Sequence, residues 1–381
     1  MSLSEFFRRE GGLASLQETK GPRIDRTAEG LVVLTPYLLG PASQTHKSTN
    51  LGDGFILRAM ERLMGVRFPP EGLMSPRVPL TDKSRSIMAS ARAILIAGAN
   101  QLNDNYTIIP GLNSQQVHEL HCVIVPFALG LHGVPERARR MSQETRHILR
   151  EIHGRIRFSS WRCPLTVEYL AREIPEIRDQ LLMTGCVVIY DEPLLGGKPF
   201  TKAEESIAVT VTERDDFWMR ETSTLRAVAG LFPKAARYLV VHQDYVGEWS
   251  WWDAVGSVVD RRRQKRLMPH KLRSYAQSLG FKVVIPSDAD AAIRFYKQID
   301  MHFGSRLHAH LLFLSQAKRS FLTRVDDRAT GMAAAFDFPL CDPQQLMGHL
   351  DFDFEPVRKA ARQHHATMQH FISCMRADLG S

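Results

Sequence analysis

Short apolar runs alternate with amphipathic stretches through the first half of the chain. The runs predict buried strands over Leu31–Leu34, Ala93–Ala97, Cys122–Ala128, Ile156–Ser159 and Cys186–Tyr190. Between them, apolar residues recur with helical spacing over Phe55–Met64, Glu136–Ile152 and Val167–Leu182. Strands that alternate with helices predict a parallel sheet covered by helices.

The second half of the chain repeats this pattern. Strands are predicted over Ile207–Val211, Tyr238–His242, Phe281–Ile285, Ile299–Phe303 and Ser320–Val325. Helices are predicted near Glu221–Leu231, Pro269–Gln277, Asp290–Lys297 and Leu307–Ala317. Two similar α/β halves therefore follow one another, which suits a chain of 381 residues, since a domain usually holds about 100–200.

A break in the alternation marks the domain boundary. Residues Asp191–Glu205 contain two prolines, a Gly-Gly pair and then several charges, a composition typical of a linker. We therefore place an N-terminal arm at residues 1–29, a first Rossmann-like domain at 30–195 and a second one at 205–350. A long helix within 354–381 is expected to pack back on the first domain.

Charge adds a preference for anionic partners. Lys and Arg number 49 against 41 Asp and Glu, and a net charge of +8 suits phosphates, carboxylates, nucleic acid or a membrane surface. The five cysteines are scattered without a CxxC pair, which argues against a disulfide framework or a zinc site. The N-terminus lacks the apolar core of a signal peptide, and no run approaches the roughly 20 apolar residues of a spanning helix. We expect a cytoplasmic protein.

Polar residues just after predicted strands are the first candidates for a site, because ligands of open α/β sheets bind beyond the carboxyl ends of the strands. Asp53 follows the opening strand near a helix start, where a carboxylate either caps free amides or accepts a proton from a ligand. Arg162 follows a short strand and has the forked guanidinium that binds carboxylates and phosphates. Arg328 follows a later strand and is expected to line the same cleft.

The most specific candidate is Phe303–His310, which runs from a predicted strand directly into an apolar helix. Free amides at a helix start attract an anion, which Arg306 would hold and His308 would protonate. A purely structural hydrogen bond is the competing interpretation of His308. His308 and His310 point to different faces of a helix, so they are a poor metal pair, and no cluster has metal-ligand spacing.

These segments resemble, in the same order, the motifs of the polysaccharide pyruvyl transferase family. Asn50–Asp53 (NLGD) is similar to its early N-x-G-D motif, and Trp161-Arg162 followed by Thr166 is similar to its central R-D-x-x-S region. Ser305–Ala309 (SRLHA) matches its late R-L-H-A motif. The chain departs from the family at Gly98–Gln101, which has one glycine in a turn that is usually glycine-rich, and at Cys163, where an Asp is common.

The resemblance implies a GT-B-like architecture, with two Rossmann-like domains facing one another across a cleft. It implies phosphoenolpyruvate as the donor substrate, no cofactor, and a pyruvate ketal formed on two hydroxyls of a saccharide acceptor. Arg162 and Arg306 would bind the donor carboxylate and phosphate, His308 would be the general acid, and Asp53 would lie at the reacting hydroxyl. The remaining expected binding residues are Asn50, Gly52, Leu307 and Arg328.

Other functions compete with this one. A GT-B glycosyltransferase with a nucleotide-sugar donor would use the same two-domain shell and basic cleft. Nucleic-acid binding would use the basic run Arg261–Arg266 with Trp251 and Trp252, although such a run is usually a solvated helix face, and we expect no nucleic-acid partner. The same run would also suit peripheral association with the inner face of a membrane, near a lipid-linked acceptor.

Overall fold

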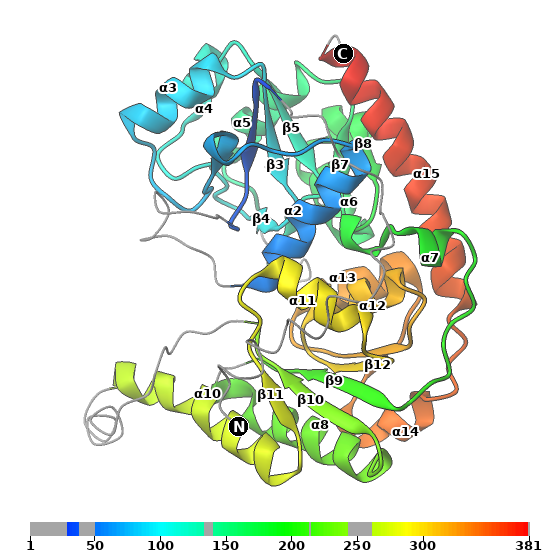
Figure 1. Ribbon diagram of the computed structural model, residues 1–381. Coiled ribbons are helices and arrows are strands. Elements are labelled where there is room, and N and C mark those ends of the chain that lie inside the picture. Colours follow the sequence, from blue (N-terminus) through cyan, green and yellow to red (C-terminus); the bar gives the residue numbers. More distant parts are fainter. Residues whose placement is uncertain (1–28, 38–49, 133–139, 213–214, 243–260, 380–381) are drawn as a thin grey trace.

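The chain folds into two α/β domains, which lie one above the other in Figure 1. The computed structural model describes residues 29–37, 50–132, 140–212, 215–242 and 261–379. Each domain has a parallel sheet with helices packed on it, which confirms the prediction of a GT-B-like fold with two Rossmann-like domains.

The first domain has a parallel sheet in the order β2-β1-β3-β5. The strands are β1 (Leu31–Leu34), β2 (Leu73–Met74), β3 (Ala93–Ala97) and β5 (Val123–Phe127). Two short parallel pairs flank the end of β5: β4 (Asn100–Leu102) with β6 (Gly130–Leu131), and β7 (Ser159–Trp161) with β8 (Leu181–Met183). The helices are α2 (Leu51–Met64), α3 (Asp82–Ser90), α4 (Ser114–Glu119), α5 (Gln143–His153), α6 (Pro164–Glu173) and α7 (Glu192–Leu195). β1 and β3 consist of buried apolar residues throughout, as strands covered on both faces require.

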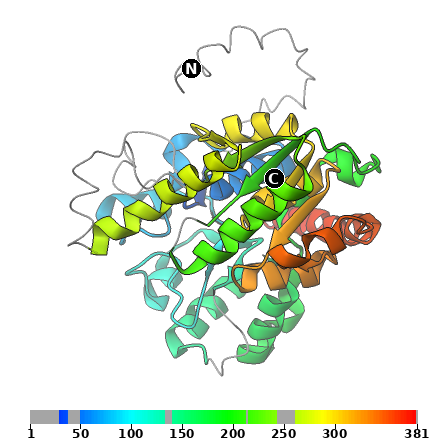
Figure 2. The same cartoon turned by 90° about the horizontal axis from the view of Figure 1, so that it is seen from below.

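The second domain has a six-stranded parallel sheet in the order β11-β10-β9-β12-β13-β14. Numbered from β9, this is 3-2-1-4-5-6, the strand order of the Rossmann fold. The strands are β9 (Ser206–Thr210), β10 (Ala236–Val240), β11 (Lys282–Val284), β12 (Met301–Gly304), β13 (Ser320–Thr323) and β14 (Leu340–Cys341). The helices are α8 (Trp218–Leu231), α10 (Arg261–Ser278), α11 (Ala289–Lys297), α12 (Leu307–Ser315), α13 (Asp327–Phe336) and α14 (Leu346–His349). α11 and α12 face the first domain, whereas α8 and α10 lie side by side on the other side of the sheet (Figures 1 and 2).

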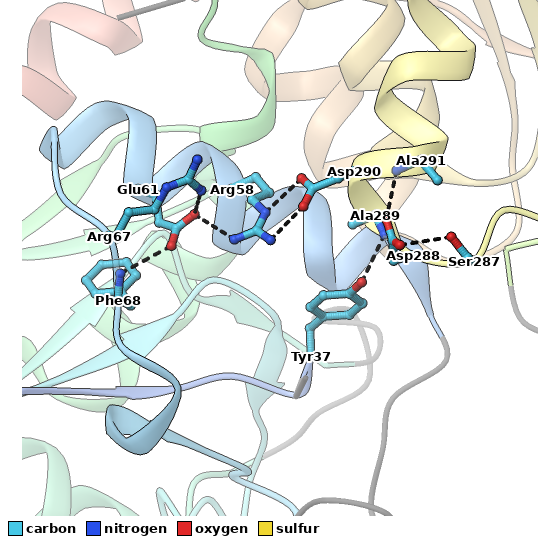
Figure 3. A network of polar contacts seen from close by, with 10 residues as sticks. All are labelled: Tyr37, Arg58, Glu61, Arg67, Phe68, Ser287, Asp288, Ala289, Asp290 and Ala291. Carbon is cyan, nitrogen blue, oxygen red and sulfur yellow. Dashed lines mark hydrogen bonds and ion pairs between the residues drawn. The ribbon is translucent and has the colours of Figure 1, made fainter. Parts of the chain in front are cut away.

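Helix α2 joins the two domains, because it packs on both α11 and α12. The guanidinium of Arg58 donates two hydrogen bonds to the carboxylate of Asp290, at 2.8 and 2.7 Å, and a third to Glu61 at 2.9 Å. The Tyr37 hydroxyl accepts a hydrogen bond from the Ala289 amide at 2.9 Å. Figure 3 shows these contacts, which place the start of α11 directly beside α2.

The last helix, α15 (Glu355–Asp378), returns to the first domain and contacts β7, β8 and α7. In Figure 1 it runs along one side of the first domain down to α13, the helix of the second domain that it contacts. The Phe371 ring packs edge-on against Phe127 with 5.3 Å between centroids, and Arg376 donates a hydrogen bond to the Met64 carbonyl at 2.7 Å. The final helix therefore completes the core of the first domain.

Two predicted elements differ in kind or in length, and the strand predicted over Ile156–Ser159 begins only at Ser159, as β7. The apolar run Cys186–Tyr190 is not a strand but contains the 3-10 helix Val187–Ile189, which packs between α2 and α12. A short buried run has no period that separates strand from helix, so the pattern alone was misleading. The helix predicted over Val167–Leu182 ends at Glu173, and a 3-10 turn that begins at Pro175 leads into β8.

Some expectations fall outside the part of the chain that the structure describes. The N-terminal arm up to residue 28 lies there, and so do Trp251 and Trp252. The basic run Arg261–Arg266 forms the first turns of α10, and only its backbone is described. No helix within the described ranges is both long enough and apolar enough to cross a bilayer.

Candidate active site

In each sheet there is a point where the strand order reverses. In both domains this point faces the cleft between the domains. The reversal lies between β1 and β3 in the first domain and between β9 and β12 in the second. Ligands of open α/β sheets bind at such points. The cleft between them has a volume of about 860 Å³, which is within the usual range for a substrate pocket.

All eight residues selected from the sequence line this cleft. They are Asn50, Gly52, Asp53, Arg162, Arg306, Leu307, His308 and Arg328. The start of α2 and the segment after β7 supply the first four, and the starts of α12 and α13 supply the others. Residues from four distant parts of the sequence, and from both domains, therefore meet at one place.

His308 lies against the start of α2. A Cβ atom on Gly52 would come within 2.7 Å of the His308 Nδ1 atom, so glycine leaves the space that the imidazole occupies. His308 is buried, and its Nε2 atom has no hydrogen-bond partner among the described residues. Burial, reinforced by the nearby charges of Arg162 and Arg328, lowers the pKa of His308 to about 3. The imidazole is therefore neutral at pH 7 as long as no anion is bound beside it.

The guanidinium of Arg162 lies directly on the backbone of Gly130. A Cβ atom there would come within 2.1 Å of the Arg162 Nε atom. Arg162 is 2% exposed, yet its side chain makes no ion pair or hydrogen bond with any residue that the structure describes. Burial lowers the pKa of Arg162, because its charge has lost water without gaining an ion pair. A buried, unpaired guanidinium at the wall of a cleft is a strong site for an anion.

The other charged residues of the cleft have partners. Arg328 donates to both carboxylate oxygens of Asp326, with 2.6 Å between Nη2 and Oδ2. Arg306 donates from Nε to the carbonyl oxygen of Val211, the residue after β9, at 2.8 Å. Asp53 is 5% exposed and faces Arg77, with 3.8 Å between Oδ2 and Nη2. The site therefore combines cations with a buried carboxylate near the start of α2.

A buried carboxylate behind the cleft, which the sequence analysis did not identify, holds two of the loops in place. Glu221 accepts a hydrogen bond from the Thr212 amide at 3.0 Å, and the hydroxyls of Thr212 and Ser305 are hydrogen-bonded at 3.0 Å. Burial raises the pKa of Glu221. Thr212 and Ser305 follow strands, a signal that the sequence contains, but nothing in the helical pattern of α8 distinguishes Glu221.

A polar wall of the cleft in the first domain is not among the residues predicted from the sequence. Asn100, Gln101, Asn103, Asn105, Tyr106 and Thr107 line it. They follow β3, so their position at a strand end was the available signal.

The arrangement suits proton transfer next to a bound anion. Arginines and the amides at the start of α12 would hold the anion, while a neutral imidazole and a buried carboxylate would move protons. Within the described ranges, no group of three or more His, Cys, Asp or Glu side chains is placed to hold a metal ion.

Comparison with family models and with curated proteins gives no match. Several solved structures have a similar course of the chain. The S. aureus MnaA–UDP co-structure is 12% identical, covers 92% of this chain and 96% of its own, and has a TM-score of 0.49. UDP-GlcNAc 2-epimerase from Neisseria meningitidis bound to UDP-GlcNAc is 12% identical over 84% and 89%, with a TM-score of 0.45. Anabaena Alr3699/HepE in complex with UDP and glucose is 9% identical over 92% and 99%, with a TM-score of 0.44. These likenesses concern the fold alone.

Proposed function

We propose that the protein is a transferase that moves a pyruvyl group from phosphoenolpyruvate to two hydroxyls of a sugar, forming a ketal and releasing phosphate. The observation that carries this proposal is the buried, unpaired guanidinium of Arg162 beside the neutral imidazole of His308. A small anion that has two acidic groups and can be protonated at carbon fits both residues. The similarity of Ser305–Ala309 to the R-L-H-A motif supports the same donor.

The donor has two anionic groups, and the cleft has cations for both. Arg162 in the first domain makes no ion pair with a described residue that a ligand would have to replace. Arg306 lies at the start of α12, where backbone amides also face an anion. A carboxylate and a phosphate bound between them would bring the enol carbon near His308. The two domains would then share one donor.

The chemistry balances with these residues. His308 delivers a proton to the methylene carbon, which becomes a methyl group and leaves a cationic centre at the neighbouring carbon. The first sugar hydroxyl adds to that centre and gives its proton to Asp53. The second hydroxyl replaces phosphate, which leaves with the remaining proton. General acid–base catalysis of this kind contributes roughly a hundred- to ten-thousandfold to a rate.

The donor itself would prepare His308 for this role. A neutral imidazole with a pKa of about 3 has no proton to give at carbon. A bound phosphate and carboxylate would neutralise the surrounding guanidinium charges and favour the imidazolium, so the pKa of His308 would rise when the donor binds. Protonation would therefore be tied to donor binding.

A second candidate is a GT-B glycosyltransferase with a nucleotide-sugar donor. The volume of about 860 Å³ favours it, because this space is large for a three-carbon donor alone. In the pyruvyl transfer proposal, the same space holds the acceptor.

Release of inorganic phosphate from phosphoenolpyruvate, measured with a panel of glycans, tests the first candidate. We expect release that depends on the acceptor and is matched by a glycan heavier by one pyruvate ketal in mass spectrometry. Transfer from a UDP-sugar, with no use of phosphoenolpyruvate, would instead establish the glycosyltransferase.

A further inference from the structure

One wall of the cleft has buried polar atoms that make no hydrogen bond with a described residue. They are the Asn100 Oδ1, Gln101 Oε1 and Tyr106 hydroxyl oxygen atoms, none of which has a hydrogen-bond partner in the described part of the chain. Buried polar groups in proteins are almost always hydrogen-bonded, since an unpaired one costs free energy. Three such groups on one short segment of a cleft wall therefore indicate partners that a ligand supplies.

Tyr106 gives the sharpest evidence. It is 4% exposed and lines the cleft, but its hydroxyl bonds to no described residue. Tyr169 in the same domain is equally buried, and its hydroxyl donates to the Asp104 carboxylate at 2.8 Å. The fold thus pairs a buried tyrosine away from the cleft and leaves the one in its wall unpaired. Burial raises the pKa of Tyr106, so its hydroxyl keeps its proton and can donate.

The wall is uncharged. Asp104 is the one charged residue between positions 100 and 107, and it is absent from the lining of the cleft. Its carboxylate accepts from Tyr169, and its backbone carbonyl accepts from Ser142 and Thr145. The amides and hydroxyls of the wall therefore suit a ligand that has many hydroxyls and no charge, because a hydroxyl both donates and accepts.

The wall adjoins the anion site. In the pair of β4 and β6, Asn100 lies opposite Gly130, and the guanidinium of Arg162 rests on Gly130. A sugar ring held by Asn100 would therefore lie next to an anion held by Arg162.

We propose that Asn100, Gln101 and Tyr106 form the acceptor subsite and that they select a neutral sugar ring by its hydroxyls. This subsite rests on the proposed function, since only a transferase has an acceptor, and it places that acceptor in the space beside the donor. It adds the chemical class of the acceptor and the residues that set specificity.

The test measures sugar binding directly, by saturation-transfer NMR, with and without phosphoenolpyruvate. The probes are neutral methyl glycosides of glucose, galactose and mannose, their disaccharides, and methyl glucuronide as the charged counterpart. We expect the neutral sugars to bind better than the glucuronide. Asn100→Ala, Gln101→Ala and Tyr106→Phe should each weaken binding roughly three- to tenfold, the effect of one lost hydrogen bond between uncharged groups.

Tyr169→Phe is the matched control. It should lower the melting temperature, because it removes the bond to Asp104, and leave sugar affinity unchanged. Tyr106→Phe should leave the melting temperature unchanged or raise it, since it removes an unpaired buried hydroxyl and no bond within the protein.

The inference is overturned if no neutral sugar binds, if the glucuronide binds better, or if the three variants bind as the wild type does. Its failure is distinct from that of the proposed function. Sugar binding that depends on these residues without any use of phosphoenolpyruvate would contradict pyruvyl transfer and leave the subsite standing. Phosphate release from phosphoenolpyruvate that is insensitive to the three substitutions would support pyruvyl transfer and contradict the acceptor subsite.

Discussion

Gly52 of the first domain and His308 of the second lie in direct contact, with no room for a side chain between them. Gly52→Ala would place a methyl group 2.7 Å from Nδ1, so the imidazole must move or the domains must separate. We expect turnover to fall roughly a hundredfold, as for a reacting group displaced by about 1 Å. Gly230→Ala, at a position where a Cβ would meet no atom within 4 Å, is the control for a glycine substitution in a helix. Equal activity of the two variants would contradict a catalytic position for His308.

His308→Gln should separate chemistry from binding. The amide keeps the space filled but cannot transfer a proton, so turnover should fall roughly a hundred- to ten-thousandfold while phosphoenolpyruvate still binds. Arg306→Ala should chiefly weaken donor affinity, by roughly ten- to a hundredfold, through the lost charge-assisted bonds. Calorimetric donor binding and a phosphate-release assay at saturating donor distinguish the two. Near wild-type turnover of His308→Gln would exclude His308 as the acid.

Arg162→Met should abolish donor binding without lowering the stability of the protein. The guanidinium of Arg162 has no partner among the described residues, so removing its charge should leave the free energy of unfolding of the empty protein unchanged or higher, while donor binding is lost. Arg358 is the matched control, because it is equally buried but donates to the carbonyls of Leu194 and Lys198. Arg358→Met should destabilise the protein by about 3 kcal/mol or more. Chemical denaturation of both variants checks this, and a large loss of stability in Arg162→Met would show that its role is structural.

Buried histidines should make the fold sensitive to acid. Burial lowers the pKa of His302 to about 3, and its ring nitrogens bond to the hydroxyls of Thr210 and Ser320. Between pH 6.5 and about 3 the unfolded chain binds a proton at this residue that the folded chain does not, so stability falls as the pH falls. His302→Gln should flatten the slope of the unfolding free energy by about 1.4 kcal/mol per pH unit between pH 6 and pH 5. An unchanged slope would mean that His302 is protonated in the folded protein.

The sequence was a good guide to the fold where elements are long or wholly apolar. β1 and β3 are runs of four and five buried residues between polar segments, and their parallel pairing follows from the helices between them. Val187–Ile189 shows the limit. This run is equally apolar, but its burial comes from α2 and α12 of different domains, a tertiary contact that no local pattern contains.

The candidate site divides in the same way. Arg162, Arg306 and His308 could be selected because they stand at strand ends in short motifs. Glu221 could not, because only a relationship in space distinguishes it, and the one signal for Tyr106 was its place after β3. Tyr106 has a hydroxyl that the fold leaves unpaired, and Glu221 accepts from Thr212, whose loop faces the cleft.

The return of α15 to the first domain bears on the order in which the protein can be made. Domains commonly fold as they emerge during synthesis, the N-terminal one first. Here Phe127 in the first sheet is fully buried, and one of its neighbours is Phe371, near the end of the chain. Until those last residues leave the ribosome, the first domain exposes an apolar surface that the second domain does not cover. The first domain therefore completes its core only when the final helix docks.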